Sequence, residues 1–308
     1  MMTKRASILP LVLKGLLGIL FVVSAILKIF DMDKFEIYIY SYRFFSLNFS
    51  FLVARAAIIV ELVLGIGLLA NCFHKLMWWG SMAMLVGYTL LLVYAQIIGR
   101  TDNCHCFGEL LPFNPWQSIL KNLVLMGLFA LAYKVKEFHF KRQGLALLGV
   151  AAISSVAVFV AVPPDNYTPN ADPMNNLNET LFHEMLTQPP LEEYELWEGK
   201  QVVGIFSTKC KYCQLAAHKL SIMQQGYGFP AENVTYVFMG SEAGIKEFYE
   251  LSESAEYRSV LYKDAVGLLK VIDGSFPTLV FVDNGAVVHE YGLRNMKESE
   301  IKAFFTQP

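Results

Sequence analysis

The first half of the chain carries a series of long apolar runs, and these constrain its fold more than any other feature. In lipid a run of this kind must satisfy its backbone polar groups internally, which predicts helices, and about 20 residues cross the hydrocarbon core. Five runs come near this length: Ile8 to Phe30, Phe51 to Cys72, Leu76 to Ile98, Gln117 to Tyr133 and Leu145 to Val162. Since 55% of the 308 residues are hydrophobic, we expect an integral membrane protein with an all-α transmembrane bundle.

The basic residues at the ends of these runs predict the direction of each crossing. They gather on one side of the membrane: Lys4, Arg5, His74, Lys75, Lys134, Lys136, Lys141 and Arg142. The loops on the other side, residues 31–50 and 99–116, hold fewer bases. The N-terminus is therefore expected in the cytoplasm, the chain in a bacterial inner membrane, and everything after Val162 in the periplasm. Val23-Ser24-Ala25 loosely resembles a signal-peptidase site, but the apolar run continues past it, which favours a retained helix; both alternatives leave this topology unchanged.

After Val162 the composition changes to that of an ordinary globular domain. Prolines and polar residues dominate Pro163 to Asn170, which predicts a short linker over residues 163–175. The expected organisation is a four-helix transmembrane domain at 1–135, a cytoplasmic loop and fifth helix at 136–162, the linker, and a periplasmic domain at 176–308. A net charge of −2, without a large basic face, argues against nucleic acid as a partner.

A C-x-x-C motif, Cys210 to Cys213, lies where a predicted strand at residues 202–206 gives way to a predicted helix. The unpaired N–H groups and dipole of the first helical turn, together with Lys209 and Lys211, favour a thiolate at Cys210. Cys213 follows one turn later on the same face and can resolve a mixed disulfide. The alternatives are two incidental cysteines or half of a zinc site, but no second ligand pair at zinc spacing occurs in this domain.

A predicted β-hairpin follows downstream. Asp283-Asn284-Gly285 separates two β-rich runs, 278–282 and 286–291, and Pro277 opens the first of them. A C-x-x-C after a strand, followed by a proline before the penultimate strand, resembles the thioredoxin family over residues 176–308, which implies an α/β thioredoxin-like fold. In that family the proline is cis and packs against the disulfide, so the resemblance implies this role for Pro277.

The chain departs from a minimal thioredoxin in two ways. The interval from Cys213 to Pro277 is long, and Tyr257 to Lys263 predicts an additional strand, as in the membrane-tethered TlpA-like branch of the family. The strand before Cys210 also lacks the buried acid that many thioredoxins use as a proton shuttle, which leaves the proton-transfer route open.

A second cysteine pair, Cys104-His105-Cys106, lies in the predicted outer loop between the third and fourth helices. It would face the same compartment as Cys210 and Cys213, and a periplasm is oxidising. A disulfide across one residue closes a small, strained ring that is reduced more easily than a structural bridge, and His105 could help to hold a thiolate. A redox pair is favoured over a structural clip or a Cys-His-Cys metal site, because a clip across one residue constrains little chain.

This C-x-C-F-G loop, together with Ser24 to Asp31 and Glu61, resembles the methylamine-utilisation MauE family of the DoxX-like superfamily over about residues 6–135. The resemblance implies a four-helix membrane protein tied to periplasmic disulfide chemistry, in its name-giving members for maturation of a disulfide-rich amine dehydrogenase. A fifth helix and a thioredoxin-like domain are additions in this chain. They favour a redox function and weaken any link to methylamine itself.

Charged groups inside the predicted helices are further candidates. Lys28 and Arg55 lie near the outer ends of their helices, where snorkelling to the interface is the simplest account. Glu61 lies about 15 Å below the surface, so it should meet Lys28, Arg55 or another polar group, or stay protonated. With Arg55, Tyr94 and Gln96 it forms a candidate pocket for a quinone headgroup, by analogy with quinone-coupled disulfide-forming proteins. The alternative is that these polar side chains only hold the helices of the bundle together.

These features predict a membrane-tethered thiol:disulfide oxidoreductase in which Cys210 attacks, Cys213 resolves, and Cys104/Cys106 exchange disulfides with them. Its partners would be periplasmic client proteins with cysteines, the bilayer and a quinone; no covalent cofactor and no metal is expected. Cys72 stands alone at the inner end of the second helix, which favours chemistry at the outer face. The direction of electron flow stays open. The alternatives are a non-enzymatic membrane assembly or scaffold factor with a structural or metal-bound C-x-C loop, and two halves that act on separate partners.

Overall fold

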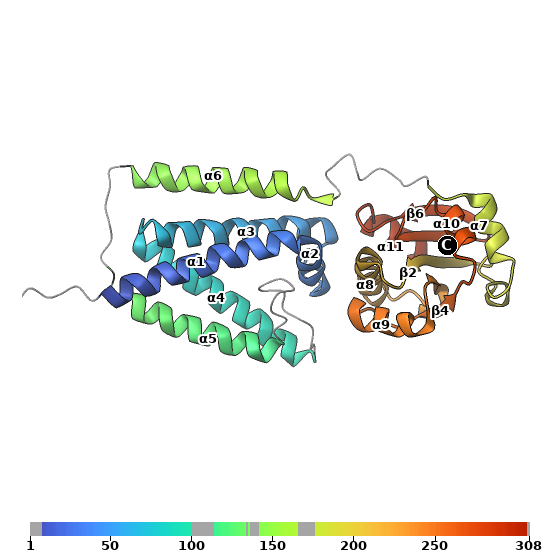
Figure 1. Ribbon diagram of the computed structural model, residues 1–308, viewed down its shortest axis with the longest axis horizontal. Helices are drawn as coiled ribbons and strands as arrows, with labels where there is room; N and C mark the ends of the chain where they lie inside the picture. The colour runs from blue at the N-terminus through green and yellow to red at the C-terminus, as the bar shows by residue number, and fades with distance from the viewer. Residues whose placement is uncertain (1–7, 100–113, 134, 136–141, 166–175, 307–308) are drawn as a thin grey trace, which may run out of the picture. The chain divides into compact units, whose positions relative to one another are not determined.

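The computed structural model describes residues 8–99, 114–133, 135, 142–165 and 176–306 (Figure 1). The chain forms two compact units, the first comprising residues 1–39 and 49–163 and the second residues 40–48 and 164–308. The first unit is helical and the second is α/β, as the sequence predicts.

Helices make up the described part of the first unit. They are α1 (Ile8–Phe30), α2 (Met32–Ser41), α3 (Leu47–Leu69), α4 (His74–Ile97), α5 (Pro115–Ala132) and α6 (Gln143–Ala161), of which α2 and α3 begin or end in the segment assigned to the second unit. Within the described ranges, four helices are long and apolar enough to cross a membrane, namely α1 from Leu9, α3, α4 and α6. The membrane bundle predicted from the sequence is thereby confirmed. Each of the five predicted runs coincides with one helix, but α5 is less apolar than the others because polar side chains occupy its first half.

Two details of the helical unit differ from the sequence prediction. Helix α2 occupies part of what was expected to be an outer loop, and its Phe35, Glu36 and Ile37 are buried. Helix α3 ends at Leu69 and not at Cys72, because Asn71 and Phe73 adopt left-handed backbone conformations with φ of 54° and 42°.

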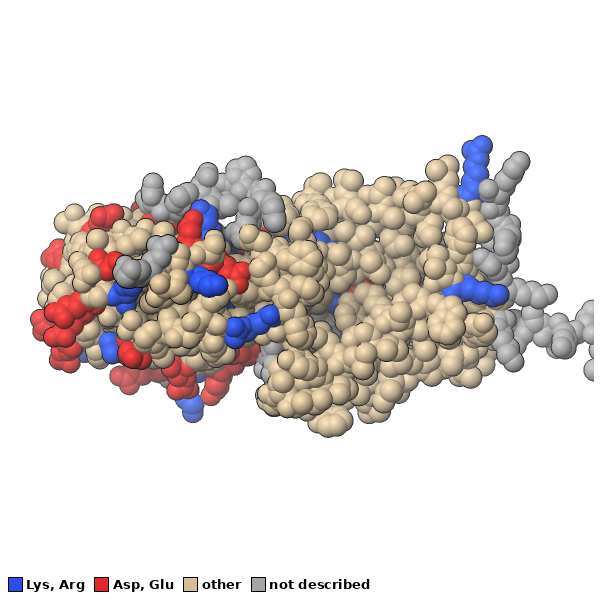
Figure 2. Space-filling view, turned by 180° about the vertical axis from the view of Figure 1, so that it is seen from behind, with Lys and Arg blue, Asp and Glu red and all other residues tan. Residues whose placement is uncertain are grey.

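Aromatic and small residues pack the helices of this unit together. Trp78 on α4 donates its indole N–H to the Phe129 carbonyl on α5 at 2.7 Å, and Phe21 on α1 meets the Phe129 ring edge-on. A Cβ at Gly18 would lie 3.0 Å from the Gly65 carbonyl oxygen, so these glycines let α1 and α3 approach closely. The face of this unit drawn in Figure 2 is almost entirely uncharged, as expected for a surface in contact with lipid.

The second unit contains a five-stranded mixed sheet in the order β4-β3-β2-β5-β6. Its strands are β2 (Lys200–Ser207), β3 (Val234–Met239), β4 (Arg258–Leu261), β5 (Thr278–Asp283) and β6 (Ala286–Tyr291). Strand β2 pairs in parallel with β3 and antiparallel with β5, and β6 closes the predicted hairpin. The additional strand predicted at Tyr257 to Lys263 is β4, which pairs in parallel with β3 at one edge.

Helices cover both faces of this sheet. They are α7 (Glu179–Leu186), α8 (Lys211–Tyr227), α9 (Glu242–Ser252), α10 (Ala265–Val271) and α11 (Glu298–Thr306), with short 3-10 turns at Glu192–Tyr194 and Ala231–Asn233. On one face Val203 and Ile205 of β2 form a core with residues of α7 and α10. On the other, Phe206 stacks on Phe248 of α9 and Phe281 packs against Phe304 of α11. This arrangement is a thioredoxin-like fold, as predicted, and it places the end of β2 at the start of α8.

Candidate functional site

The C-x-x-C motif lies at the junction between β2 and α8. Strand β2 ends at Ser207, and Cys210 is the N-cap residue of α8. Its Sγ accepts a hydrogen bond from the backbone N–H of Cys213 at 3.2 Å, in the position where a serine or aspartate oxygen would cap an ordinary helix. The predicted strand-to-helix setting is therefore what the structure shows.

The two thiols lie in different surroundings. Cys210 is partly exposed and Cys213 is fully buried, and both are unbridged. The hydrogen bond with the Cys213 thiol lowers the pKa of Cys210 to about 7, with help from the N–H groups of Cys213 and Tyr212, although partial burial opposes the shift. Burial raises the pKa of Cys213 well above its usual range, and the Cys210 sulfur adds to this effect. Cys210 is thus suited to attack and Cys213 is held back as a thiol.

A groove of about 260 Å³ adjoins this motif. It is lined by Tyr212, Phe276 and Pro277 and by the four residues 292–295 between β6 and α11. The Phe276-Pro277 peptide bond is cis, as the thioredoxin resemblance implies. Tyr212, which lies between the two cysteines in the sequence, thus connects the C-x-x-C motif to this groove.

The buried positions of β2 hold no acidic residue that could transfer a proton to or from Cys213. Val202, Val203, Ile205 and Phe206 fill them, so this strand brings no carboxylate toward Cys213. The sequence prediction that the usual buried acid is missing from this strand is confirmed.

Residues 104–106 lie outside the described part of the chain. The redox role of Cys104 and Cys106, and the contribution of His105, therefore remain predictions from the sequence. Cys72 is buried just beyond the end of α3, and its thiol donates to the Ala70 carbonyl oxygen at 3.6 Å.

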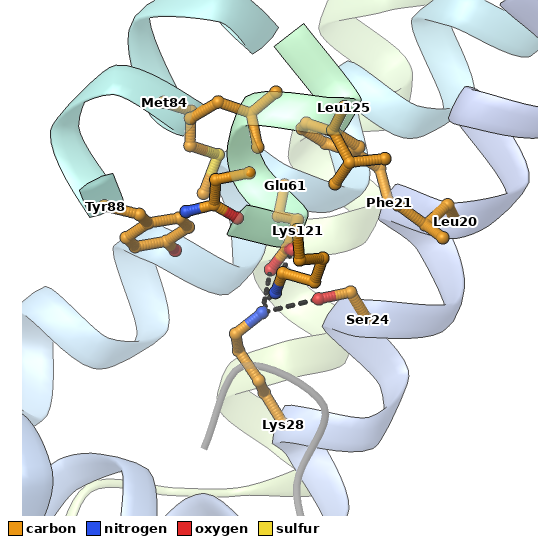
Figure 3. Close-up of a pocket in the computed structure, with 11 residues that line it drawn as sticks. Leu20, Phe21, Ser24, Lys28, Glu61, Met84, Tyr88, Lys121 and Leu125 are labelled. Atoms are coloured by element: carbon orange, nitrogen blue, oxygen red, sulfur yellow. Dashed lines mark hydrogen bonds and ion pairs between the residues drawn. The ribbon is translucent and has the colours of Figure 1, made fainter. Parts of the chain in front are cut away.

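Glu61 is paired inside the helical unit. Its two carboxylate oxygens accept from the Lys28 ammonium at 3.0 and 2.8 Å, and Lys28 also donates to Ser24 Oγ at 2.7 Å (Figure 3). Lys28 and Glu61 are 2% and 4% exposed. The expectation that Lys28 snorkels to the interface is wrong, because an internal carboxylate satisfies its charge.

Arg55 is also buried, at 1% exposure, and the expectation of snorkelling is wrong for it as well. Its guanidinium pairs with Glu36 of α2 and donates to the Phe51 and Val162 carbonyl oxygens. The sequence prediction missed Glu36, because it lies in a segment that was expected to be a loop. Arg55 and Glu61 therefore belong to two separate ion pairs.

A cavity of about 30 Å³ adjoins the Lys28–Glu61 pair. Its polar lining includes Ser24, Tyr88, Lys121 and Asn122, and Figure 3 shows the Lys121 ammonium pointing toward Glu61. Tyr94, Gln96 and Arg55 do not line it. The structure thus does not bring the predicted quinone-pocket residues together around this cavity, and it adds Lys121 and Tyr88. Lys121 could have been noticed as a charge within an apolar run, whereas Tyr88 has no such signal.

Comparisons with known proteins agree with this division of the chain. Residues 6–135 match the family model described as methylamine utilisation protein MauE, which confirms the predicted resemblance over the same residues. The chain is 25% identical to Protein TlpB of Flavobacterium psychrophilum, and the match covers 82% of each chain. No solved structure matches. The chain thus joins a helical region that matches the MauE family model to a thioredoxin-like domain.

Proposed function

We propose that this protein is a membrane-tethered thiol:disulfide oxidoreductase whose working pair is Cys210 and Cys213. The observation that carries the proposal is the contrast between the two thiols. Cys210 caps α8 with a pKa lowered to about 7, whereas Cys213 is buried directly beside it. A low-pKa, partly exposed thiolate next to a protected resolving thiol is the arrangement that disulfide exchange requires.

The exchange has two steps. The Cys210 thiolate attacks one sulfur of a client disulfide, the client S–S bond breaks, a mixed disulfide forms, and the first client sulfur leaves as a thiolate. Cys213 then loses its proton and attacks Cys210 Sγ, which releases the second client thiolate and leaves a Cys210–Cys213 disulfide. The client gains two electrons and the domain loses two. The same steps in reverse oxidise a client dithiol.

The membrane region would exchange disulfides with this pair through Cys104 and Cys106. The distribution of basic residues supports an orientation with both cysteine pairs in the periplasm and the N-terminus in the cytoplasm. Clients would be periplasmic proteins with cysteines. The family model names methylamine utilisation, and by the resemblance to its name-giving members an amine dehydrogenase would be one client class.

A quinone is the proposed electron acceptor in the oxidase direction. The buried Lys28–Glu61 pair and Lys121 support a polar site within the bundle. A cavity of about 30 Å³ has room for a water molecule but not for a ring, so a headgroup would bind only after side chains such as Lys121 and Tyr88 move. Reduction of a soluble ubiquinone analogue by the dithiol protein, followed by its absorbance, tests this step; no reduction would remove the quinone from the proposal.

The relay between the two cysteine pairs can be tested by trapping. Cys213→Ser prevents Cys210 from resolving a mixed disulfide. In this variant the linker is cleaved at an engineered site near Pro163-Pro164, and the fragments are separated on non-reducing gels. We expect the two fragments to stay joined until reductant is added.

Matched variants identify the bond that joins the fragments. Adding Cys104→Ser together with Cys106→Ser should release them, whereas Cys72→Ser should not. Fragments that separate in the Cys213→Ser protein would show that the two halves act independently. If the protein still supports its cellular function after Cys→Ser changes in both Cys104/Cys106 and Cys210/Cys213, it acts as a scaffold and the oxidoreductase proposal fails.

A further inference from the structure

Arg294 gives the groove next to the C-x-x-C motif a positive charge. The groove is lined by Tyr212, Phe276, Pro277 and residues 292–295, and among these Arg294 carries the ionic charge. Its side chain is 47% exposed, so it lies on the rim and within reach of a bound segment. A guanidinium in this place favours a carboxylate on whatever the groove binds.

The loop that carries Arg294 is held firmly against the rest of the domain. Lys219 of α8, which is 1% exposed, donates to the Leu293 carbonyl oxygen at 2.9 Å. The Asn295 side chain accepts from the Gly292 N–H at 2.6 Å. Because α8 also carries Cys210, the Lys219 contact ties the groove wall to the helix of the attacking thiol, and Arg294 is pre-organised relative to it.

Asp165 shows that Arg294 accepts a carboxylate in this position. Its Oδ1 lies 2.7 Å from Arg294 Nη1, and the Asp165 side chain is 6% exposed. Asp165 belongs to the segment that follows α6, outside the thioredoxin-like sequence that starts at residue 176. A carboxylate from another part of the chain therefore occupies the rim where a client carboxylate would bind.

The charged side chains next to Cys210 in the sequence are cationic, like Arg294. Lys209 and Lys211 flank Cys210 and are both exposed. Acidic residues outnumber basic ones in residues 176–306, and Figure 2 shows many of them on the outer surface of this domain. The cationic rim of the groove thus differs from its surroundings, which is a basis for electrostatic selection.

We propose that the groove selects client segments in which an acidic residue lies next to the reacting cysteine, with Arg294 as the specificity-determining residue and Asp165 as an internal competitor for it. This inference rests on the proposed function, because it names the class of segment that Cys210 attacks. A client carboxylate displaces Asp165 from Arg294 as the segment enters the groove.

The full-length protein in detergent provides the test. Three peptides share one cysteine, linked to thionitrobenzoate, and differ in two flanking residues, which are aspartate, asparagine or lysine. Cys210 attacks the peptide sulfur and releases thionitrobenzoate, which is followed by its absorbance. Each rate is divided by that of the same peptide with 2-mercaptoethanol, an uncharged thiol, which removes differences in intrinsic reactivity.

The aspartate peptide should react about threefold faster than the asparagine peptide at low salt, in keeping with a partly exposed ion pair, and the preference should fade as salt is added. Arg294→Gln should abolish the preference, so that the aspartate and asparagine peptides react at equal rates with that variant, and Arg294→Lys should retain part of it. Asp165→Asn should increase the preference. If Arg294→Gln keeps the preference for the aspartate peptide, Arg294 does not determine specificity. If Asp165→Asn leaves the preference unchanged, Asp165 does not compete with the client carboxylate.

Two controls separate this inference from its alternatives. Lys270→Gln removes a positive charge from α10, which does not line the groove, and should leave the preference intact; an equal loss there would mean that net charge alone selects the peptide. Peptides with serine in place of cysteine report binding without chemistry. Arg294-dependent binding without exchange would refute the proposed function alone, and exchange without any charge preference would refute this inference alone.

Discussion

At the scale of single residues, the site depends on two sulfur atoms that differ in burial and in hydrogen bonding. Cys210 is an N-cap whose sulfur accepts from the Cys213 N–H, and Cys213 is enclosed in the core. Their roles follow from these surroundings and not from their order in the sequence.

The lowered pKa of Cys210 predicts the pH dependence of its reactivity. In the reduced protein, alkylation by iodoacetamide should rise with pH through a midpoint of about 7 and level off above it, because only the thiolate reacts. Below the midpoint the rate should fall tenfold for each pH unit. Mass spectrometry should locate the label on Cys210, and Cys213 should react only after denaturation. A midpoint above 8 in the native protein would contradict the proposed activation.

The Lys28–Glu61 pair supports a second residue-scale prediction. Removing one partner leaves a buried charge without its counterion, so Lys28→Met or Glu61→Gln should destabilise the membrane unit by about 3–5 kcal/mol. Replacing both by methionine should cost clearly less, because no charge stays uncompensated. Thermal unfolding in detergent, followed by tryptophan fluorescence, measures this. A double variant as unstable as the sum of the single ones would show that the pair contributes through packing and not through charge.

At the scale of elements, local patterns predicted most of what surrounds Cys210. The strand, the cap and the hairpin depend on neighbours in sequence, so their residues could be read directly. The partners of buried charges could not be predicted in this way. Lys219 finds its acceptor at Leu293, far along the chain, and Arg55 finds Glu36 on a helix that the sequence suggested was a loop. Such pairings depend on packing between elements, which a single sequence does not show.

The approach of β3 to the C-x-x-C loop supports an element-scale prediction. Gly240 follows β3 with φ of 150°, and a Cβ there would lie 2.1 Å from Thr208 Oγ1. Gly240→Ala should therefore destabilise the domain by about 1–3 kcal/mol and disturb the loop before Cys210. Adding Thr208→Ala should recover part of the loss, because the clashing atoms are removed. Urea unfolding and the Cys210 alkylation rate report the two effects.

Gly228→Ala is the matched control for this element. Gly228 also has a positive φ, 67°, but a Cβ would contact nothing within 4 Å. Gly228→Ala should lower the free energy of unfolding only by the cost of placing alanine in a left-handed backbone conformation, and adding Thr208→Ala should not restore that loss. Equal rescue of both variants would show that Thr208 is not the clashing neighbour.

At the scale of the whole molecule, the proposed function requires both cysteine pairs on one side of the membrane. The helical unit supplies the apolar spans, and the α/β unit supplies the C-x-x-C motif at the start of α8. The two were predictable separately, because apolar length and motif spacing are both local properties. Their joint action requires that residues 104–106 and Cys210 share a compartment, which depends on how the helices insert.

Insertion can be measured with the cysteines themselves. In a variant with Cys104, Cys106 and Cys213 replaced by serine, Cys210 and Cys72 remain, and Cys72 is 5% exposed. A membrane-impermeant maleimide added to sealed, right-side-out vesicles should label Cys210, because the flanking basic residues predict an N-terminus inside and the five crossings expected from the sequence would place the thioredoxin-like domain outside. Cys72 should stay unlabelled until the protein is denatured. If Cys210 is labelled only in inverted vesicles, the thioredoxin-like domain lies in the cytoplasm. Reducing conditions there oppose disulfide formation, so the proposed exchange with Cys104 and Cys106 would lack an oxidising compartment.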